Sequence, residues 1–387
     1  MDYGDPDLYT SAERHTRWRA LAAADRMEWS APGSSPTGFW SVFSHRACAA
    51  VLAPSAPFTS EYGMMIGFDR DSSGGRMMVV TDDGPHRGLR KLVGPLMSRA
   101  SARSVADRVD KEADELLDRV LDAPSCDVAA EFGPRVPAAV VCDLLGIPPD
   151  DQDMLIGLTN HAFGGEDDLF DGMTPRQAHT EILVYFDELI TARRRLPGDD
   201  LVSVLLGDGG LDADDVLLNC DNVLIGGNET TRHAITGAVH ALATTPGLLE
   251  VVRDRGDDLG PVVEEVLRWT SPAMHVLRVT TVRTVLNGHE LDAGTPVVAW
   301  LPAANRDPAM FDEPDAFRVD RRPNRHLTFG HGAHHCLGAA LARVELAVVL
   351  RALARRVSRV ELAGDVKWLR AITVQGYRAL PVRFTAS

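Results

Sequence analysis

One stretch of the sequence indicates most about the fold and chemistry of this chain: Phe329-Gly330-His331-Gly332-Ala333-His334-His335-Cys336-Leu337-Gly338. Its glycines allow backbone conformations that are closed to other residues, and they let the chain approach a flat ligand closely. Cys336 stands where a helix is predicted to begin, at Leu337. Unpaired N–H groups and the helix dipole at such a position favour a thiolate over a thiol. A thiolate presented by a glycine-rich loop is suited to be the axial ligand of a metal.

Two other interpretations of the same stretch stay open on the residues alone. His331, His334, His335 and Cys336 together suggest a zinc site. Four ligands within six residues are cramped for a tetrahedral ion, however, and no second CxxC or HxxxH lies nearby. The other interpretation is a buried structural cysteine. The remaining four cysteines are scattered along the chain, which predicts free thiols packed in the core of a protein in a reducing compartment.

Composition places the chain among large soluble globular proteins. It has 387 residues, of which 45% are hydrophobic and 25% charged, so it is not disordered, collagen-like or a small disulfide scaffold. The net charge of −15 argues against a nucleic-acid partner. The first 30 residues contain no apolar signal core, and no stretch of about 18 apolar residues is present that could span a bilayer. We therefore expect a cytoplasmic protein with no membrane partner.

Helical periodicity dominates the chain. Residues 101–121 place apolar side chains three and four positions apart, with Ser101 as a candidate cap. Residues 211–243 form the longest predicted helix, and the acidic residues at its start favour that end. A further helix is predicted from Leu337 to about Leu353.

Strands are fewer and lie late in the sequence. Strand-like patterns cover 276–286, 296–301 and 370–384, and an irregular segment rich in Pro, Asn and Asp covers about 302–335. A loop of that length inside a compact chain is usually functional. The predicted fold class is mainly α with a minor β-sheet.

The stretch around Cys336, in the form F-G-x-G-x-H-x-C-x-G, resembles the haem-thiolate signature of the cytochrome P450 superfamily. Further matches extend from about residue 80 to 345. The resemblance implies one catalytic domain over residues 1–387, the P450 fold, haem b as cofactor and a monomer. It assigns Cys336 as the ligand of the haem iron.

The segment Glu265-Val266-Leu267-Arg268 resembles the ExxR pair of that family. Spacing of three residues places both side chains on one helix face, where they can form an ion pair. The family completes the pair with a later arginine, and Arg321 stands at the matching place. The role implied is structural, and the alternative is an ordinary solvated charged face.

The segment Pro85-His86-Arg87-Gly88-Leu89-Arg90 resembles the family's helix that grips a haem propionate. His86 and Arg90 are four residues apart and share a helix face, so both can reach one carboxylate. Arg278 and His334 also match propionate partners of the family. Each of these residues alone would more often be an ordinary surface residue.

Residues 221–232, DNVLIGGNETTR, resemble the family's oxygen-activating helix. Gly226 and Gly227 each weaken a helix by about 1 kcal/mol relative to alanine, so their presence in mid-helix needs a reason. A groove that admits dioxygen would supply that reason, and we also expect a local bulge there. The resemblance makes Thr230 a hydrogen-bond donor to the oxygen and Glu229 a relay of protons from water. The alternative is a plain polar stripe on a helix.

Pocket residues follow from the same resemblance. Ile225 and Asn222 lie one turn before the glycines, and Asn222 either binds substrate or is satisfied by a neighbouring helix. Other expected wall residues, from the loop at 58–78 and the segment 272–277, are Met65, Met274 and Val276. The acidic region at 150–190 is expected to be a lid.

The function implied is a monooxygenase that oxidises a small molecule in specialised metabolism. Oxidative coupling or ring closure on the same scaffold, and a haem carrier or sensor without turnover, stay open as alternatives. No flavin or nicotinamide fingerprint is present, so electrons must come from a separate protein. The resemblance implies that this donor is a ferredoxin with its reductase. The cations expected to bind an acidic ferredoxin are Arg87, Lys91, Arg99, Arg343 and Arg351.

Overall fold

The structure of the protein is a computed structural model that describes residues 1–33, 35–53, 56–66, 73–163, 173–207 and 209–387. Most of these residues are helical, and four small sheets account for the strands, which confirms the predicted fold class. The chain forms two compact units, each assembled from separate stretches of sequence. Two of the positions at which the chain passes from one unit to the other lie inside helices, one in α3 (Asp83–Val93) and one in α12 (Gly260–Thr270). A single catalytic domain over residues 1–387 stays a prediction.

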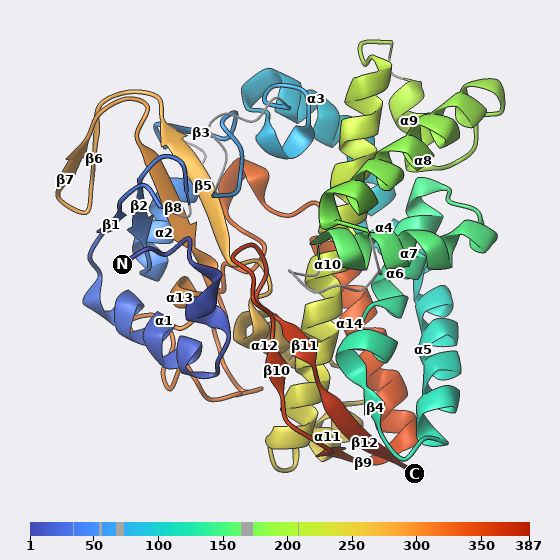
Figure 1. Ribbon diagram of the computed structural model, residues 1–387. Coiled ribbons are helices and arrows are strands. Elements are labelled where there is room, and N and C mark those ends of the chain that lie inside the picture. The colour runs from blue at the N-terminus through green and yellow to red at the C-terminus, as the bar shows by residue number, and fades with distance from the viewer. Residues whose placement is uncertain (34, 54–55, 67–72, 164–172, 208) are drawn as a thin grey trace. The chain divides into compact units, whose positions relative to one another are not determined.

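The first unit, formed by Met1–Arg87, Glu264–Leu337 and Arg370–Gly376, is built on a five-stranded sheet in the order β1-β2-β8-β5-β3 (Figure 1). Its central strand ends at Trp300, whose fully buried ring stacks on Trp18 with centroids 5.3 Å apart. Aromatic burial of this size anchors the sheet to the first helix. The other elements of the unit are η1 (Pro6–Tyr9), α1 (Glu13–Ala24), β1 (Glu28–Ser30), β2 (Phe39–Val42), α2 (His45–Leu52), β3 (Phe58–Thr59), η2 (Met78–Val80), β5 (His275–Thr280), β6 (Thr284–Leu286), β7 (His289–Leu291), β8 (Pro296–Trp300), α13 (Leu301–Ala304) and η5 (Gly332–His334).

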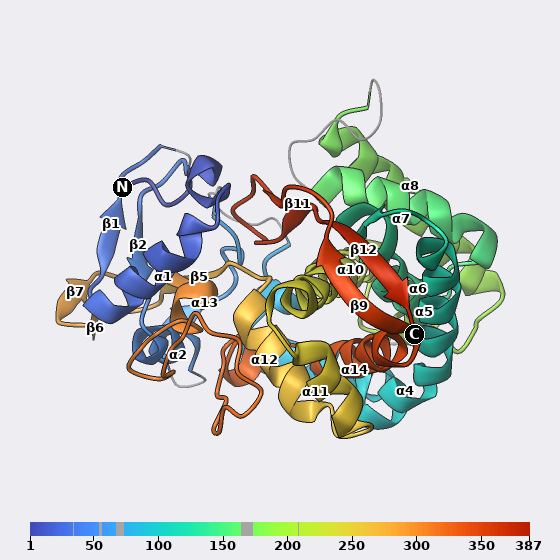
Figure 2. The same ribbon diagram turned by 90° about the horizontal axis from the view of Figure 1, so that it is seen from below.

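The second unit, formed by Gly88–Val263, Gly338–Leu369 and Tyr377–Ser387, is a helical assembly around α10 (Ala213–Thr244). Figures 1 and 2 show α10 passing among α6, α8 and α14, against which it packs. Asp212 and Asp215 cap its start reciprocally, as the acidic run predicted. The other elements are η3 (Gly94–Met97), α4 (Arg99–Ser104), α5 (Ala106–Leu121), β4 (Cys126–Asp127), η4 (Val128–Phe132), α6 (Arg135–Leu145), α7 (Pro149–Phe163), α8 (Pro175–Arg195), α9 (Leu201–Leu206), α11 (Leu248–Arg255), α14 (Ala339–Arg356), β9 (Val357–Leu362), β10 (Lys367–Trp368), β11 (Tyr377–Ala379) and β12 (Pro381–Ala386).

Several predicted boundaries were wrong. The helix expected over 101–121 is two helices, and Ser101 lies inside α4 instead of capping a helix. The helix expected from Leu337 begins at Ala339, so Cys336 precedes it by three residues and does not stand at its first turn. The strand-like run 276–286 is divided by a turn into β5 and β6, because periodicity alone does not reveal a reversal of the chain.

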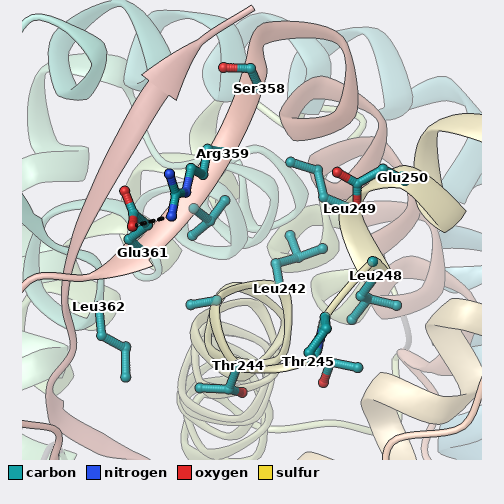
Figure 3. Close-up of a pocket in the computed structure, with 14 residues that line it drawn as sticks. Leu242, Thr244, Thr245, Leu248, Leu249, Glu250, Ser358, Arg359, Glu361 and Leu362 are labelled. Carbon is teal, nitrogen blue, oxygen red and sulfur yellow. Dashed lines mark ion pairs between the residues drawn. The ribbon is translucent and has the colours of Figure 1, made fainter.

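A hollow of about 450 Å³ in the second unit lies between the C-terminal end of α10, the start of α11 and β9 (Figure 3). Arg359 and Glu361 form an ion pair of 2.8 Å at its wall. None of the described residues that line it is among those predicted for the active site. In the described part of the chain, no helix by itself is long and apolar enough to cross a membrane; α10 and α11 meet those criteria only as a pair, with a bend of 114° between them.

Candidate active site

The loop that carries Cys336 is shaped by its own backbone within the first unit. Gly330 and Gly332 have φ angles of 69° and 79°, which other residues rarely adopt. The amide of Cys336 donates to the carbonyl oxygen of Phe329 at 2.8 Å and closes the loop. Cys336 is exposed in this unit, whereas the other four cysteines, all in the described part of the chain, are buried. The loop therefore presents one accessible sulfur.

No three His, Cys, Asp or Glu side chains among the described residues are grouped so that they could hold a metal ion. His331 and His335 are exposed, while the ring of His334 is turned to a hydrogen bond with Asp82. The zinc interpretation of this stretch therefore gains no support from the geometry.

A polar cluster in the same unit brings together three of the four predicted propionate partners. The rings of His86 and His334 stack with centroids 4.1 Å apart. Arg278 is 6% exposed, and its burial lowers its pKa to about 10, an effect that the nearby carboxylate of Asp82 opposes. Arg90 lies one turn after His86 on α3 and is half-buried. The first unit thus offers nitrogen donors suited to carboxylates.

The predicted ion pair of Glu265 and Arg268 is present and fully buried, with Arg268 Nη2 2.7 Å from Glu265 Oε1. Arg321 Nε joins it at 3.2 Å from Glu265 Oε2. Arg268 also donates to three backbone carbonyls, of Asn305, Pro314 and Ala316. A buried charge set with this many hydrogen bonds is satisfied and rigid, and removing one member leaves the others uncompensated.

The two glycines of α10 have different surroundings. A Cβ on Gly227 would overlap the side chain of Val141 in α6, so close helix packing requires glycine there. A Cβ on Gly226 would meet no atom within 4 Å, and this residue is exposed in its unit. Gly227 thus packs closely against α6, and open space lies beside Gly226. The oxygen groove formed by the two glycines stays a prediction. The expected bulge is absent, because α10 is continuous from Ala213 to Thr244.

Glu229 and Thr230 follow the glycines but differ in their surroundings. The Thr230 hydroxyl donates to the carbonyl oxygen of Gly226 at 3.0 Å, and the side chain is half-buried. Glu229 is 2% exposed, and its carboxylate accepts no hydrogen bond from the described residues. Burial raises the pKa of Glu229, while Arg232, with Nη1 3.4 Å from Oε1, opposes the shift. Such a carboxyl can hold a proton at a higher pH than an exposed one.

Arg232 is fixed in turn by α7. Its Nη1 donates to the Asn160 side-chain oxygen, and its Nε donates to His233 Nε2 at 3.2 Å. Neither Arg232 nor Asn160 was predicted as a site residue from the sequence. Arg232 could have been found from its spacing of three residues after Glu229, whereas Asn160 carries no sequence signal because it lies 72 residues away.

Comparison with known proteins identifies the chain. A model of the cytochrome P450 family matches residues 259–365. The sequence is 35% identical to the cytochrome P450 NovI of Streptomyces niveus, over 100% of this chain and 96% of that protein. The chain belongs to the cytochrome P450 family. It is also 30% identical to the linalool 8-monooxygenase of Pseudomonas putida over 98% of both proteins. A crystal structure of P450 OxyD, involved in the biosynthesis of vancomycin-type antibiotics, has 74% identity and a TM-score of 0.97, covering 100% of both chains.

Membership of the family makes the protein a P450 monooxygenase with haem b as its cofactor. The residues present fit this group. Cys336 offers an exposed sulfur on a glycine-shaped loop, and His86, His334 and Arg278 offer nitrogen donors in the same unit. When bound, the haem supplies the iron at which dioxygen is activated.

The expected pocket residues are placed unequally. Met274 is fully buried in an apolar cluster with Trp18 and Trp300 and so belongs to the core of its unit, which corrects its assignment to a pocket wall. The sequence could not show this, because methionine fills cores and ligand sites equally well. The residues that are half-buried in their own units are Met65, Asn222, Ile225 and Val276. Residues 67–72 of the expected wall loop and residues 164–172 of the expected lid lie outside the described residues.

The cations expected to meet an electron donor differ in accessibility. Lys91 and Arg87 are exposed. Arg343 is half-buried and donates to the carbonyl oxygen of Ala339, and Arg351 forms an ion pair of 3.1 Å with Asp257. The side chain of Arg99 lies outside the described set. Among the four cations whose side chains are described, Lys91 and Arg87 therefore have the least shielded charges.

Proposed function

We propose that this protein is a haem-thiolate monooxygenase that oxidises a small organic molecule during the biosynthesis of an antibiotic. The observation that carries the proposal is the Cys336 loop. It exposes one sulfur, and its backbone is shaped by two glycines with positive φ angles. The likeness to P450 OxyD, whose described role is in the biosynthesis of vancomycin-type antibiotics, supports the substrate class.

The side chains of the chain have distinct roles in this proposal. The Cys336 thiolate holds the iron, and His86, Arg90, Arg278 and His334 bind the two haem carboxylates. Thr230 exchanges its hydrogen bond with Gly226 for one to dioxygen, in the open space beside that glycine. Glu229, kept away from bulk water, holds a proton and passes it toward Thr230.

Electrons come from a ferredoxin and its reductase in this proposal. Ferredoxins are acidic, and this protein has a net charge of −15, so a local group of cations has to overcome a general repulsion. Lys91, Arg87 and Arg343 serve that purpose by steering and orienting the encounter. We also propose that the protein lies in the cytoplasm and is a monomer.

The carbonyl difference spectrum of the reduced protein tests the ligand. We expect the parent protein to bind one haem b and to show the red-shifted Soret band of a thiolate complex, and Cys336→Ala to lack that band. Cys126→Ala is the matched control, because it removes a buried thiol that is not part of the motif. An unchanged band in Cys336→Ala would contradict the assignment.

A second experiment tests the reaction. Natural-product precursors that shift the haem spectrum on binding are turned over under ¹⁸O₂ with a ferredoxin system. Incorporation of one labelled oxygen atom into product supports hydroxylation. A product that has lost hydrogen and gained no label would show oxidative coupling or ring closure instead, and a spectral shift with no product from any precursor would favour a haem carrier or sensor.

A further inference from the structure

We propose that Asn160 is a positioning residue for proton delivery, which holds Arg232 away from Glu229 and so leaves the Glu229 carboxyl able to take up and release a proton. The inference rests on the proposed role of Glu229 as a proton relay. All three residues lie in the second unit, Asn160 on α7 and the other two on α10.

A second buried pair in this chain shows the contact that the spacing of Glu229 and Arg232 allows. Glu265 and Arg268 are also three residues apart on one helix, and both are fully buried. Arg268 Nη2 and Nε donate to the two carboxylate oxygens of Glu265 at 2.7 and 2.9 Å. A carboxylate that accepts two charge-assisted hydrogen bonds is favoured in its ionised form. Such a pair serves structure and is unsuited to proton transfer.

Glu229 and Arg232 do not form such a pair. Arg232 Nη1 lies 3.4 Å from Glu229 Oε1, and neither carboxylate oxygen of Glu229 accepts a hydrogen bond from the described residues. Both side chains are buried, so bulk water does not supply the missing bonds. Burial therefore raises the pKa of Glu229, and the charge of Arg232 opposes this shift without a hydrogen bond.

The nitrogen donors of Arg232 are directed to other acceptors. Its Nη1 donates to the side-chain oxygen of Asn160, and its Nε donates to His233 Nε2 at 3.2 Å. His233 is the next residue of α10, so Asn160 is the acceptor that another helix provides. A hydrogen bond from a charged donor is stronger than one between neutral groups, which makes Asn160 an effective anchor for the guanidinium.

The position of Arg232 thus decides how readily Glu229 holds a proton. Arg232 is the one charged group of the described residues that acts on the Glu229 carboxyl. The titratable neighbours in sequence, His161 on α7 and His233 on α10, are buried and do not shift it. Loss of the Asn160 acceptor would leave Nη1 to donate to Glu229, as Arg268 does to Glu265.

An infrared titration of the ferric holoenzyme tests the proposal. The C=O stretching band of protonated Glu229 is identified by its absence in Glu229→Gln, and its loss is followed as the pH rises. We expect Asn160→Ala to release Arg232 toward Glu229, so that the pKa of Glu229 falls and its proton affinity drops about tenfold or more. Asn160→Asp keeps an acceptor and binds Arg232 more tightly, so its band should persist to a pH at least as high as in the parent.

The matched control is Thr159→Val, which removes a buried hydroxyl of α7 that donates to the Leu155 carbonyl. A band that titrates alike in Asn160→Ala and in this control would overturn the proposal. Loss of the band at a lower pH in Asn160→Asp would also overturn it, because only a general disturbance of the contact between α7 and α10 acts alike in both variants. This second variant decides the matter even where Asn160→Ala fails to fold.

Turnover separates the positioning role from the relay on which it rests. The rate in Asn160→Ala should decline at a lower pH than in the parent, and Asn160→Ala/Glu229→Gln should match Glu229→Gln, because Asn160 acts through that carboxyl. A parental pH profile in Asn160→Ala, or additive losses in the double variant, would overturn the positioning role alone. Parental turnover in Glu229→Gln would overturn the relay itself, and that variant shows this without any change at Asn160.

Discussion

Thr230 and Glu229 are neighbours on α10, yet their surroundings suit them to different parts of the proposed proton transfer. The Thr230 hydroxyl already has an acceptor, the Gly226 carbonyl, so its donation can be redirected without leaving a buried group unsatisfied. Glu229 has no hydrogen-bond partner among the described residues and a single cation, Arg232, beside it. Thr230 is therefore suited to donate its hydrogen bond to a different acceptor, and Glu229 is suited to hold one proton.

We expect Thr230→Ala to keep haem and substrate binding and to divert most reducing equivalents to peroxide or water, since the oxygen loses its hydrogen-bond donor. Product formed per reductant consumed, with peroxide measured in parallel, checks this outcome. Thr231→Ala is the matched control on the next position of the same helix. Parental coupling in Thr230→Ala would show that the hydroxyl is not part of proton delivery.

For Glu229→Gln we expect turnover to fall by about a hundredfold, because an amide cannot relay a proton. Burial raises the pKa of Glu229, and an acid with a raised pKa loses its proton as the pH rises through that value. The parent rate should therefore decline toward high pH, and the Gln variant should show no such decline. Stopped-flow turnover across pH 6–9 measures both; matching pH profiles would exclude Glu229 as the proton source.

At the scale of elements, α14 follows Cys336 closely in the chain and carries a buried acid. Its first residue follows Cys336 by three positions, and its later turns pack into the helical unit through Leu346, Val349 and Leu353. Glu345 stands on that buried side, 3% exposed, and its Oε2 accepts no hydrogen bond from the described residues. Burial raises the pKa of Glu345 to about 8.

Glu345 should make the stability of the helical unit depend on pH. The folded state prefers the protonated carboxyl, so stability is lost as pH rises from about 4.3, the ordinary value for Glu, through about 8. We expect Glu345→Gln to be more stable than the parent by about 1–3 kcal/mol at pH 9, with little difference at pH 5. Urea unfolding at both pH values measures this, with the exposed Glu250→Gln as control. Equal gains at both pH values would contradict a titration of Glu345.

At the scale of the whole molecule, the proposed encounter with a ferredoxin is a matter of charge. The net charge of −15 would repel an acidic partner, so the proposal needs local cations on the segments that follow His86 and Leu337 in the chain. Lys91 is exposed and Arg343 half-buried, and both lie in the second unit.

Reversing Lys91 and Arg343 to Glu should lower the rate of reduction by an acidic ferredoxin by about tenfold or more at low salt, and less at high salt. Peroxide-driven turnover, which needs no donor, should be unchanged. Arg359→Glu changes the net charge at the hollow beside α11 and is the control. Equal losses in the ferredoxin and peroxide assays would point to damage to the fold, and no loss in either would remove these residues from the donor site.

The sequence by itself identified the Cys336 loop, the long helix over 211–243 and the pairing of Glu265 with Arg268. Each depends on residues close together in the chain, where spacing decides which side chains share a turn or a helix face. The fold class followed from the same local periodicity. These features need no knowledge of what packs against them.

Only the tertiary structure decided which distant groups meet and which apolar residues are core. Asp82 reaches His334 across 252 residues of sequence, and Asn324 reaches Glu265 across 59. Met274 became core and Gly227 a packing residue because of neighbours in other elements. Burial and partner distance arise from long-range packing, which local patterns do not encode, and they are what set the charge and orientation of the site residues.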